Sequence, residues 1–252
     1  MNNKEIQKQI ELKWNSILNN EPTEENCKEA YDEIYSYFLR SKGTISDNDL
    51  TFIAKVFIKF IGSNNKILEI GCGDGLFSRK LADKNNDVVG IDVSKIAIDI
   101  ANKNKNSKLN IKYLCGDARK LNFENNHFDI VVSMDVVEHI PPQEIINHFN
   151  EVNRVIKSGG YYLFWTPHKY YSATSLGLHL KEYTLKEIVD ILNKSNFQPF
   201  IFGYFSNIKV RNYMIMYEKI LYKTGIYKIG KFVRPVKLLI PPLCIYAQKI
   251  DK

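Results

Sequence analysis

The feature of this chain that most constrains its fold is an alternation of short apolar segments with helical segments, which begins at Lys66. The apolar segments are rich in valine, isoleucine and tyrosine, as buried β-strands are. They lie at residues 66–70, 88–92, 111–115, 128–134 and 159–167, and helical patterns lie between several of them at 76–84, 94–104 and 143–156. Strands and helices that alternate at this spacing form a parallel sheet covered on both faces. The sequence therefore predicts a doubly wound α/β fold.

The chain continues past the fifth predicted strand with one more helix and two more strands. Thr184 and Glu187 form a Thr-x-x-Glu capping pattern, which predicts a helix over residues 185–192. Apolar, aromatic segments at 198–205 and 243–250 read as strands. These elements extend the sheet beyond its parallel part.

Two regions stand apart from this alternation. Residues 1–62 contain three stretches with a periodic apolar face, so we expect an N-terminal helical cap ahead of a ligand-binding domain at residues 63–252. Residues 206–240 are longer than a turn between neighbouring strands requires, and we expect a helical insertion before the last strand. Three roles stay open for this insertion: a helix packed on the body of the protein, a lid over the acceptor, or a peripheral contact with an anionic membrane.

A glycine-rich loop, "GCGDG", follows the first predicted strand directly. In doubly wound sheets ligands bind beyond the carboxyl ends of the strands, and this loop lies there. The alternating glycines Gly71, Gly73 and Gly75 allow a tight turn and let a ligand touch the backbone. A tight turn without a ligand would give the same pattern, so the loop alone does not decide the function.

Two carboxylates at the ends of the next two strands favour a nucleoside ligand. Asp92 lies about twenty residues beyond the glycines, where a carboxylate can accept hydrogen bonds from ribose hydroxyls. Asp117, beside the small Ala118, is placed to accept a hydrogen bond from an adenine amino group. Three successive strand ends thus offer a bare loop, a ribose acceptor and a base acceptor.

The charges around the loop favour a cationic nucleoside over a dinucleotide. The glycines follow a GxGxG pattern instead of the dinucleotide pattern GxGxxG, because Leu76 stands at the last position. Glu69 precedes the loop and Asp74 lies within it, and carboxylates at these positions disfavour a pyrophosphate. S-adenosylmethionine, which carries a sulfonium and an ammonium group, fits such an acidic surround.

Taken in order, the segments "LEIGCGDG", "GIDVS", "CGDARKLNF", "FDIVVSMDVVEHI" and "VNRVIKSGGYYLFWTP" resemble the successive motifs of class I S-adenosylmethionine-dependent methyltransferases. The most similar type is the broad group that includes the ubiquinone-biosynthesis O-methyltransferases. The resemblance implies a Rossmann-like, mostly parallel sheet of seven strands that ends in an antiparallel hairpin. It also implies S-adenosylmethionine as cofactor. With the neighbouring Cys72 and Val93 included, the predicted cofactor residues are Glu69, Gly71, Cys72, Gly73, Asp92, Val93, Asp117, Ala118, Met134 and Asp135.

Methyl transfer is an in-line displacement, so the protein mainly aligns the donor with the acceptor and excludes water. An acceptor oxygen or nitrogen with a high pKa also needs a base. His139, after the fourth predicted strand, and His179, before the capping pattern, are the candidate catalytic residues, although either could instead order the site. His148 lies in the middle of a predicted helix, where we expect a surface position, and His127 lies in a polar loop.

Composition narrows the remaining choices of metal, location and partner. The four cysteines are far apart, without metal-ligand spacing, and no carboxylate cluster compels a metal, so we predict no metal site and a reducing, cytoplasmic location. The net charge of +7 comes largely from scattered lysines, which favours a solvated surface over a nucleic-acid patch. The sequence does not indicate an oligomeric state.

We therefore expect a methyltransferase that acts on an oxygen or nitrogen of a small molecule, a sugar or a lipid-like acceptor. One alternative is an RNA or protein methyltransferase, although the Asn/Asp-Pro-Pro-aromatic motif typical of amino-directed nucleic-acid enzymes is missing after the fourth strand, which reads "SMDVVEH". The other alternative is a non-catalytic protein that binds S-adenosylmethionine.

Overall fold

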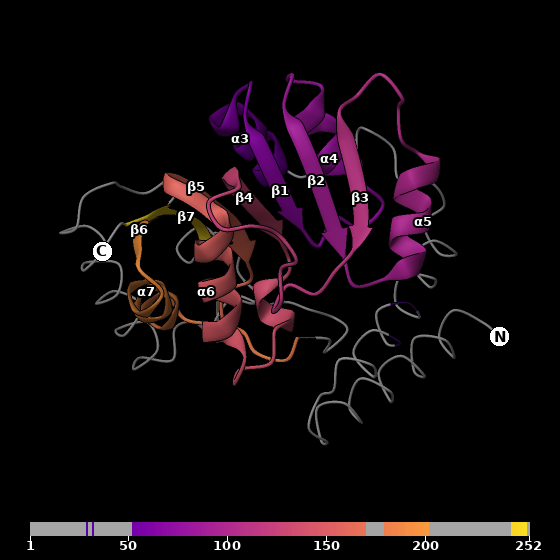
Figure 1. Ribbon diagram of the computed structural model, residues 1–252. Helices are drawn as coiled ribbons and strands as arrows, with labels where there is room; N and C mark the ends of the chain where they lie inside the picture. Colours follow the sequence, from indigo (N-terminus) through magenta and orange to yellow (C-terminus); the bar gives the residue numbers. More distant parts are fainter. Residues whose placement is uncertain (1–28, 30–31, 33–51, 170–178, 202–242, 251–252) are drawn as a thin grey trace.

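The computed structural model describes residues 29, 32, 52–169, 179–201 and 243–250. Figure 1 shows a central sheet with helices on both sides. The strands are β1 (Lys66–Ile70), β2 (Asp87–Asp92), β3 (Ile111–Cys115), β4 (Phe128–Met134), β5 (Ile156–Thr166), β6 (Phe197–Ile201) and β7 (Leu243–Lys249). The helices are α3 (Phe52–Ile61), α4 (Leu76–Ala82), α5 (Lys95–Lys103), the short 3₁₀ helix η2 (Val137–His139), α6 (Ile145–Val155) and α7 (Leu185–Lys194). Within the described residues, every helix is too short or too polar to cross a membrane.

The seven strands lie in the order β3-β2-β1-β4-β5-β7-β6. Strands β1 to β5 run parallel to one another, whereas β7 runs antiparallel to both β5 and β6. This confirms the predicted doubly wound, mostly parallel sheet of seven strands with an antiparallel hairpin. The strand order reverses between β1 and β4, and ligands bind at that position in sheets of this kind.

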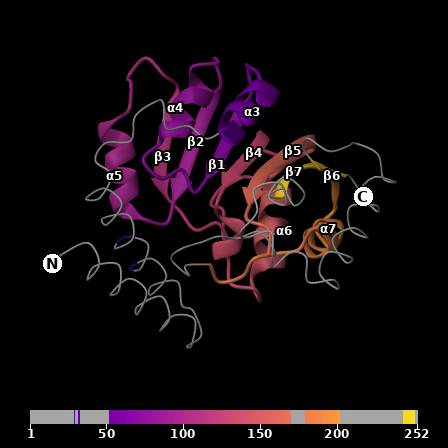
Figure 2. The same cartoon turned by 180° about the vertical axis from the view of Figure 1, so that it is seen from behind.

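The two faces of the sheet carry separate hydrophobic clusters, because successive side chains of a strand point to opposite faces. On β1, Ile67 packs in the cluster that contains residues of α3, α4 and α5. Leu68 and Ile70 pack in the other cluster, with residues of α6 and α7. Figures 1 and 2 show these two groups of helices on opposite sides of the sheet.

Some element boundaries differ from the expectation. Strand β5 begins directly after α6, three residues earlier than predicted, because Ile156 pairs with Phe128 before a register shift in the β4–β5 ladder. Strand β6 is described from Phe197 to Ile201, and the rest of its predicted length lies outside the described residues.

The predicted division into a cap at 1–62 and a domain at 63–252 stays a prediction. Of the expected N-terminal helices, the structure describes α3 together with Glu29 and Asp32, both in helical conformation. The helical insertion predicted at 206–240 lies outside the described residues, so its three candidate roles stay predictions.

The predicted capping box is confirmed at the start of α7. The Thr184 hydroxyl accepts a hydrogen bond of 3.2 Å from the Glu187 N–H, and the Glu187 carboxylate accepts one of 2.9 Å from the Thr184 N–H. Two N–H groups that the helix leaves without partners are satisfied in this way. The box fixes the point at which the chain turns from His179 into the helix that covers β6.

Replacing Thr184 with alanine should lower the free energy of unfolding by about 1 kcal/mol, because the side-chain acceptor for the Glu187 N–H is lost. Urea denaturation of the variant and the wild type measures this difference. Lys186→Ala is the control, since Lys186 is exposed and pairs with Asp190 one turn away. An unchanged midpoint for Thr184→Ala would contradict the assignment of this cap.

Candidate functional site

The loop between β1 and α4, residues 71–75, depends on glycines that a larger residue could not replace. Gly71 has a φ of +72°, and a Cβ atom there would lie 2.4 Å from Cγ2 of Val136. Gly75 has a φ of +78°, and a Cβ atom there would lie 2.3 Å from the hydroxyl oxygen of Tyr113. Positive φ and close contact both exclude a side chain. The loop backbone therefore packs directly against the residues after β4 and against β3.

Asp92 joins this loop to the end of β2. Its Oδ2 atom accepts a hydrogen bond of 2.9 Å from the N–H of Gly73, and its Oδ1 atom accepts one of 2.9 Å from the N–H of Ser94. Burial raises the pKa of Asp92, and these N–H donors act in the opposite direction. The hydroxyl of Ser94 in turn donates to Asp32, so the N-terminal part of the chain reaches this edge of the sheet.

Glu69 lies beneath the loop and is only 5% exposed. The hydroxyl of Ser78 donates a hydrogen bond to its carboxylate. Burial raises the pKa of Glu69 to about 8, and the Ser78 hydrogen bond only partly offsets this effect. Without a ligand, Glu69 is therefore mostly protonated at pH 7. A cation bound nearby would favour its ionised form.

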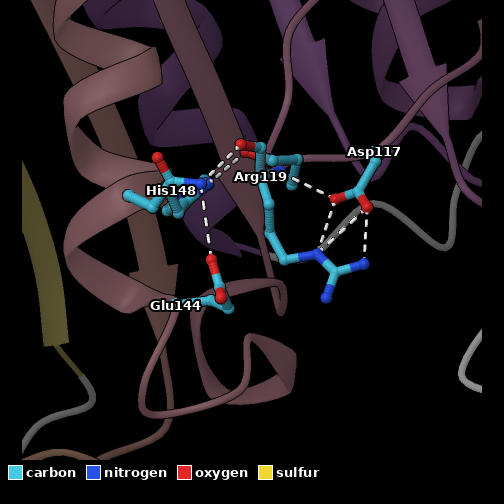
Figure 3. Close-up of polar contacts among 6 residues, drawn as sticks. Asp117, Arg119, Glu144 and His148 are labelled. Atoms are coloured by element: carbon cyan, nitrogen blue, oxygen red, sulfur yellow. Dashed lines mark hydrogen bonds and ion pairs between the residues drawn. The ribbon is translucent and has the colours of Figure 1, made fainter. Parts of the chain in front are cut away.

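The loop after β3 carries Asp117 and Arg119 as an ion pair, which Figure 3 shows. The guanidinium of Arg119 contacts both carboxylate oxygens of Asp117 at 2.6–3.0 Å, and the backbone N–H of Arg119 donates to Oδ1 at 2.7 Å. Burial alone would raise the pKa of Asp117, but the hydrogen bonds and charge of Arg119 outweigh it and hold the pKa below its usual range. Arg119 was not among the residues predicted from the sequence, although a basic residue two positions after a predicted base acceptor was a visible signal.

The predicted cofactor residues all lie at one edge of the sheet, because the carboxyl ends of parallel neighbouring strands point the same way. They end or follow β1 to β4: Glu69, Gly71, Cys72, Gly73, Asp92, Val93, Asp117, Ala118, Met134 and Asp135. Asp135 adopts a φ of +55°, a left-handed conformation uncommon outside glycine. Their contacts with a cofactor stay predictions.

Both predicted catalytic histidines lie beside Glu138, a carboxylate that is fully buried. Oε2 of Glu138 accepts a hydrogen bond of 2.8 Å from the Thr166 hydroxyl. Oε1 of Glu138 has no hydrogen-bond partner within the described part of the chain, and it lies 4.0 Å from Nε2 of His139 and 3.9 Å from Nε2 of His179. Burial, followed by the charge of Asp135, raises the pKa of Glu138 well above its usual range. The structure thus brings together two histidines that are far apart in the sequence.

This group also has the composition of a metal site. Glu138, His139 and His179 each offer one ligand atom, and these atoms lie within 4.8 Å of one another. A carboxylate and two imidazoles suit a divalent transition metal. The sequence analysis predicted no metal, since it did not foresee that His179 would reach this position.

Glu182 holds the other side of the His179 ring, with Nδ1 of His179 2.8 Å from Oε1 of Glu182. An ionised carboxylate accepts the proton on Nδ1, so Nε2 of a neutral ring is left as the basic atom, facing Glu138. The rings of His139 and His179 meet edge to face, with centroids 5.1 Å apart.

The predicted surface position of His148 is wrong. His148 is fully buried on α6, where its ring contacts the carbonyl of Ala118 and the hydroxyl of Tyr162. Burial lowers its pKa to about 4, so the ring is neutral at pH 7. The structure places His127, by contrast, in the loop before β4, away from His139 and His179.

Comparisons with known proteins identify the type of domain. A family model described as a methyltransferase domain matches residues 67–160. The chain is 38% identical over 109 residues to a ubiquinone biosynthesis O-methyltransferase of Coxiella burnetii, which covers 42% of this chain and 45% of that protein. It is 33% identical over 183 residues to phosphoethanolamine N-methyltransferase 2 of Caenorhabditis elegans, which covers 67% of this chain and 40% of that protein. The chain therefore spans less than half the length of either relative.

A solved structure gives the same fold. The S-adenosylmethionine-dependent methyltransferase from Mesorhizobium loti has a TM-score of 0.57 and 15% sequence identity, with 81% of this chain and 100% of that chain covered. A likeness at this level of identity concerns the fold alone. The matched domain, the curated relatives and the open seven-stranded sheet agree that residues 67–160 form a methyltransferase domain of the class I, S-adenosylmethionine-dependent type.

Proposed function

We propose that this chain binds S-adenosylmethionine and transfers its methyl group to an oxygen or nitrogen of a small-molecule, sugar or lipid-like acceptor. The observation that carries the proposal is the contact of the glycine loop with the end of β2 and with the residues after β4, where the strand order reverses. There the N–H of Gly73 is bonded to Asp92, and Gly71 packs against Val136 after β4. The cofactor side and the histidine side of the site therefore share one edge of the sheet. The match of residues 67–160 to a methyltransferase domain supports the same conclusion.

Residues of the loop and of the strand ends would each contact a different part of the cofactor. Asp92 would accept hydrogen bonds from ribose hydroxyls, Asp117 and Ala118 would contact the adenine, and Glu69 would lie near the ammonium group. When bound, S-adenosylmethionine supplies an electrophilic methyl group on its sulfonium, which an acceptor atom displaces in line. The chain has to align that acceptor and keep water out.

We place the acceptor atom beside Glu138, His139 and His179. The distances of 3.9–4.0 Å between Glu138 Oε1 and the two Nε2 atoms leave these groups converging without bonding one another directly. An acceptor hydroxyl between them could pass its proton to an imidazole as the new carbon–oxygen bond forms. His179 is the better oriented base, because Glu182 already holds its Nδ1 proton. A divalent cation held by the same three side chains would instead orient the acceptor oxygen and lower its pKa.

The acceptor remains to be identified by experiment. Mass spectrometry of the purified protein would detect a bound cofactor, and a methyl-transfer screen would follow. The screen includes a prenylated catechol, phosphoethanolamine, a sugar, RNA and a mixed protein substrate, each with and without a chelator. Turnover of RNA or protein would favour the alternative class, and the absence of turnover with every acceptor would favour a non-catalytic binding protein.

Asp92→Asn should weaken binding of S-adenosylhomocysteine by about tenfold to a hundredfold, roughly 1.5–3 kcal/mol, because charged acceptors for the ribose hydroxyls are lost. Calorimetry measures this affinity. Asp99→Asn is the control, since Asp99 is exposed on α5 and pairs with Lys95. Equal affinity of the wild type and Asp92→Asn would contradict the assignment of Asp92 as the acceptor for the ribose hydroxyls.

Binding of the cofactor should release a proton from Glu69. Because the pKa of Glu69 in the free protein is about 8, the group is protonated below that pH, and a bound ammonium favours its ionised form. Affinity should therefore rise between about pH 5.5 and 7, below the titration of the ligand's own amino group, by at most about tenfold per pH unit. Calorimetry in buffers of different ionisation enthalpy counts the released protons. Glu69→Gln should abolish the release, and equal proton release by both proteins would contradict the assignment.

The base should be identified by comparing His179→Ala with His139→Ala in the methyl-transfer assay. Loss of a general base lowers kcat by about a hundredfold or more, and cofactor affinity should stay nearly unchanged. We expect the larger loss for His179→Ala, because the hydrogen bond from Nδ1 of His179 to Glu182 orients that ring. His127→Ala is the control. Full activity with weakened cofactor binding would instead show that the histidine only orders the site.

A further inference from the structure

Helix α6 binds the backbone of the loop after β3 with a row of side chains. The bonds join Asn147 to the carbonyl of Arg119, His148 to the carbonyl of Ala118, Glu151 to the N–H of Leu121, and Arg154 to the carbonyls of Leu121 and Phe123. Figure 3 shows His148 on the helix and the Asp117–Arg119 pair on the loop. The loop that carries Asp117 and Ala118 is therefore positioned by α6, a helix that follows β4 in the sequence.

His148 differs from the other members of this row because it is fully buried and its hydrogen bonds continue into the sheet. Nδ1 lies 2.8 Å from the Ala118 carbonyl oxygen, and Nε2 lies 3.1 Å from the Tyr162 hydroxyl. That hydroxyl lies 2.8 Å from Oγ of Ser133, on β4 just before Met134. A buried hydrogen-bonded chain thus connects the loop after β3 to the end of β4.

The chemistry of the partners fixes the position of each proton in this chain. A carbonyl oxygen can only accept, so Nδ1 of His148 carries the proton. Because the ring is neutral, Nε2 is an acceptor, and the Tyr162 hydroxyl must donate to it. The Tyr162 oxygen can then accept from Ser133. Each of these groups has one orientation that satisfies all of its neighbours.

The bond from His148 also acts on Asp117, through one peptide unit. The carbonyl of Ala118 and the N–H of Arg119 belong to the same planar peptide, so a donor held on the carbonyl side fixes the direction of the N–H. That N–H donates to Oδ1 of Asp117 at 2.7 Å. The side chain of His148 is thereby linked to the orientation of the Asp117 carboxylate.

We propose that His148 is a positioning residue that makes the site selective for adenine, by holding the 118–119 peptide and through it the Asp117 carboxylate. This inference rests on the proposed function, in which Asp117 accepts a hydrogen bond from the adenine 6-amino group. A base with an oxygen at that position would turn an acceptor toward the carboxylate and bind less well.

Two substitutions of His148 separate its two hydrogen bonds. In asparagine the amide nitrogen is attached at the same carbon position as Nδ1, so His148→Asn keeps a donor for the Ala118 carbonyl. In glutamine the amide lies one bond further out, near the position of Nε2, so His148→Gln keeps the contact with Tyr162 and loses the one with Ala118. Both variants remove the imidazole ring, and we expect similar losses in melting temperature.

The readout is the ratio of the dissociation constants of S-inosylhomocysteine and S-adenosylhomocysteine, measured by calorimetry. For the wild type we expect a ratio of about ten or more, because one charged hydrogen bond is exchanged for a repulsion. His148→Asn should keep that ratio. His148→Gln should lower it several-fold, since the Arg119 N–H no longer holds Oδ1 of Asp117 in line and only the Arg119 guanidinium still orients the carboxylate.

Control variants and outcomes separate this inference from the proposed function. Asn147→Ala removes an exposed bond to the Arg119 carbonyl, and Tyr162→Phe removes the hydroxyl beyond Nε2, and both should keep the wild-type ratio. Equal ratios for His148→Asn and His148→Gln would overturn the role of His148. A wild-type protein that binds neither compound would overturn the proposed function instead.

A measurement on the wild type tests the inference even if the His148 variants do not fold. Long-range ¹⁵N–¹H correlation spectra should show His148 as the neutral tautomer with its proton on Nδ1 from about pH 5 to 8, because its pKa lies near 4. A proton on Nε2 would break the link to the Ala118 carbonyl and contradict the proposal.

Discussion

The ligand-binding edge of this protein depends on how the glycine loop is held against the end of β2. The carbonyl of Ile91 accepts hydrogen bonds from the N–H groups of Gly71 and Cys72, and the Asp92 carboxylate accepts one from Gly73. These bonds fold the loop back over the sheet at the reversal of strand order. Because the loop backbone is bonded to β2, the loop lies at the same end of the sheet as the residues after β4.

Burial shifts three titratable groups of different elements toward their uncharged forms. The pKa of Glu69 is raised to about 8, that of Glu138 is raised well above its usual range, and that of His148 is lowered to about 4. A cationic ligand would restore the charge of a carboxylate at the moment of binding, which links affinity to pH.

The two halves of the site are built in different ways. The proposed cofactor half uses loops that follow four neighbouring strands, and each contributes residues close together in the sequence. The proposed acceptor half combines η2, Thr166 at the end of β5, and His179 and Glu182, which precede α7. The residues predicted to bind the cofactor therefore lie in short local motifs, whereas the groups around Glu138 come from separate segments of the chain.

The sequence by itself determined the sheet, the loop and the cap. Alternating apolar segments predicted five parallel strands, glycines marked a loop where side chains would clash with Val136 and Tyr113, and Thr184 with Glu187 marked a helix start. These features depend on neighbours in the chain, so local patterns reveal them. Only the tertiary structure decided that His148 is buried against Ala118 and that Arg119 forms an ion pair with Asp117. It also brought His139 and His179 together beside Glu138. Those contacts join residues from different elements, and their geometry follows from the packing of helices on the sheet, which no local pattern encodes.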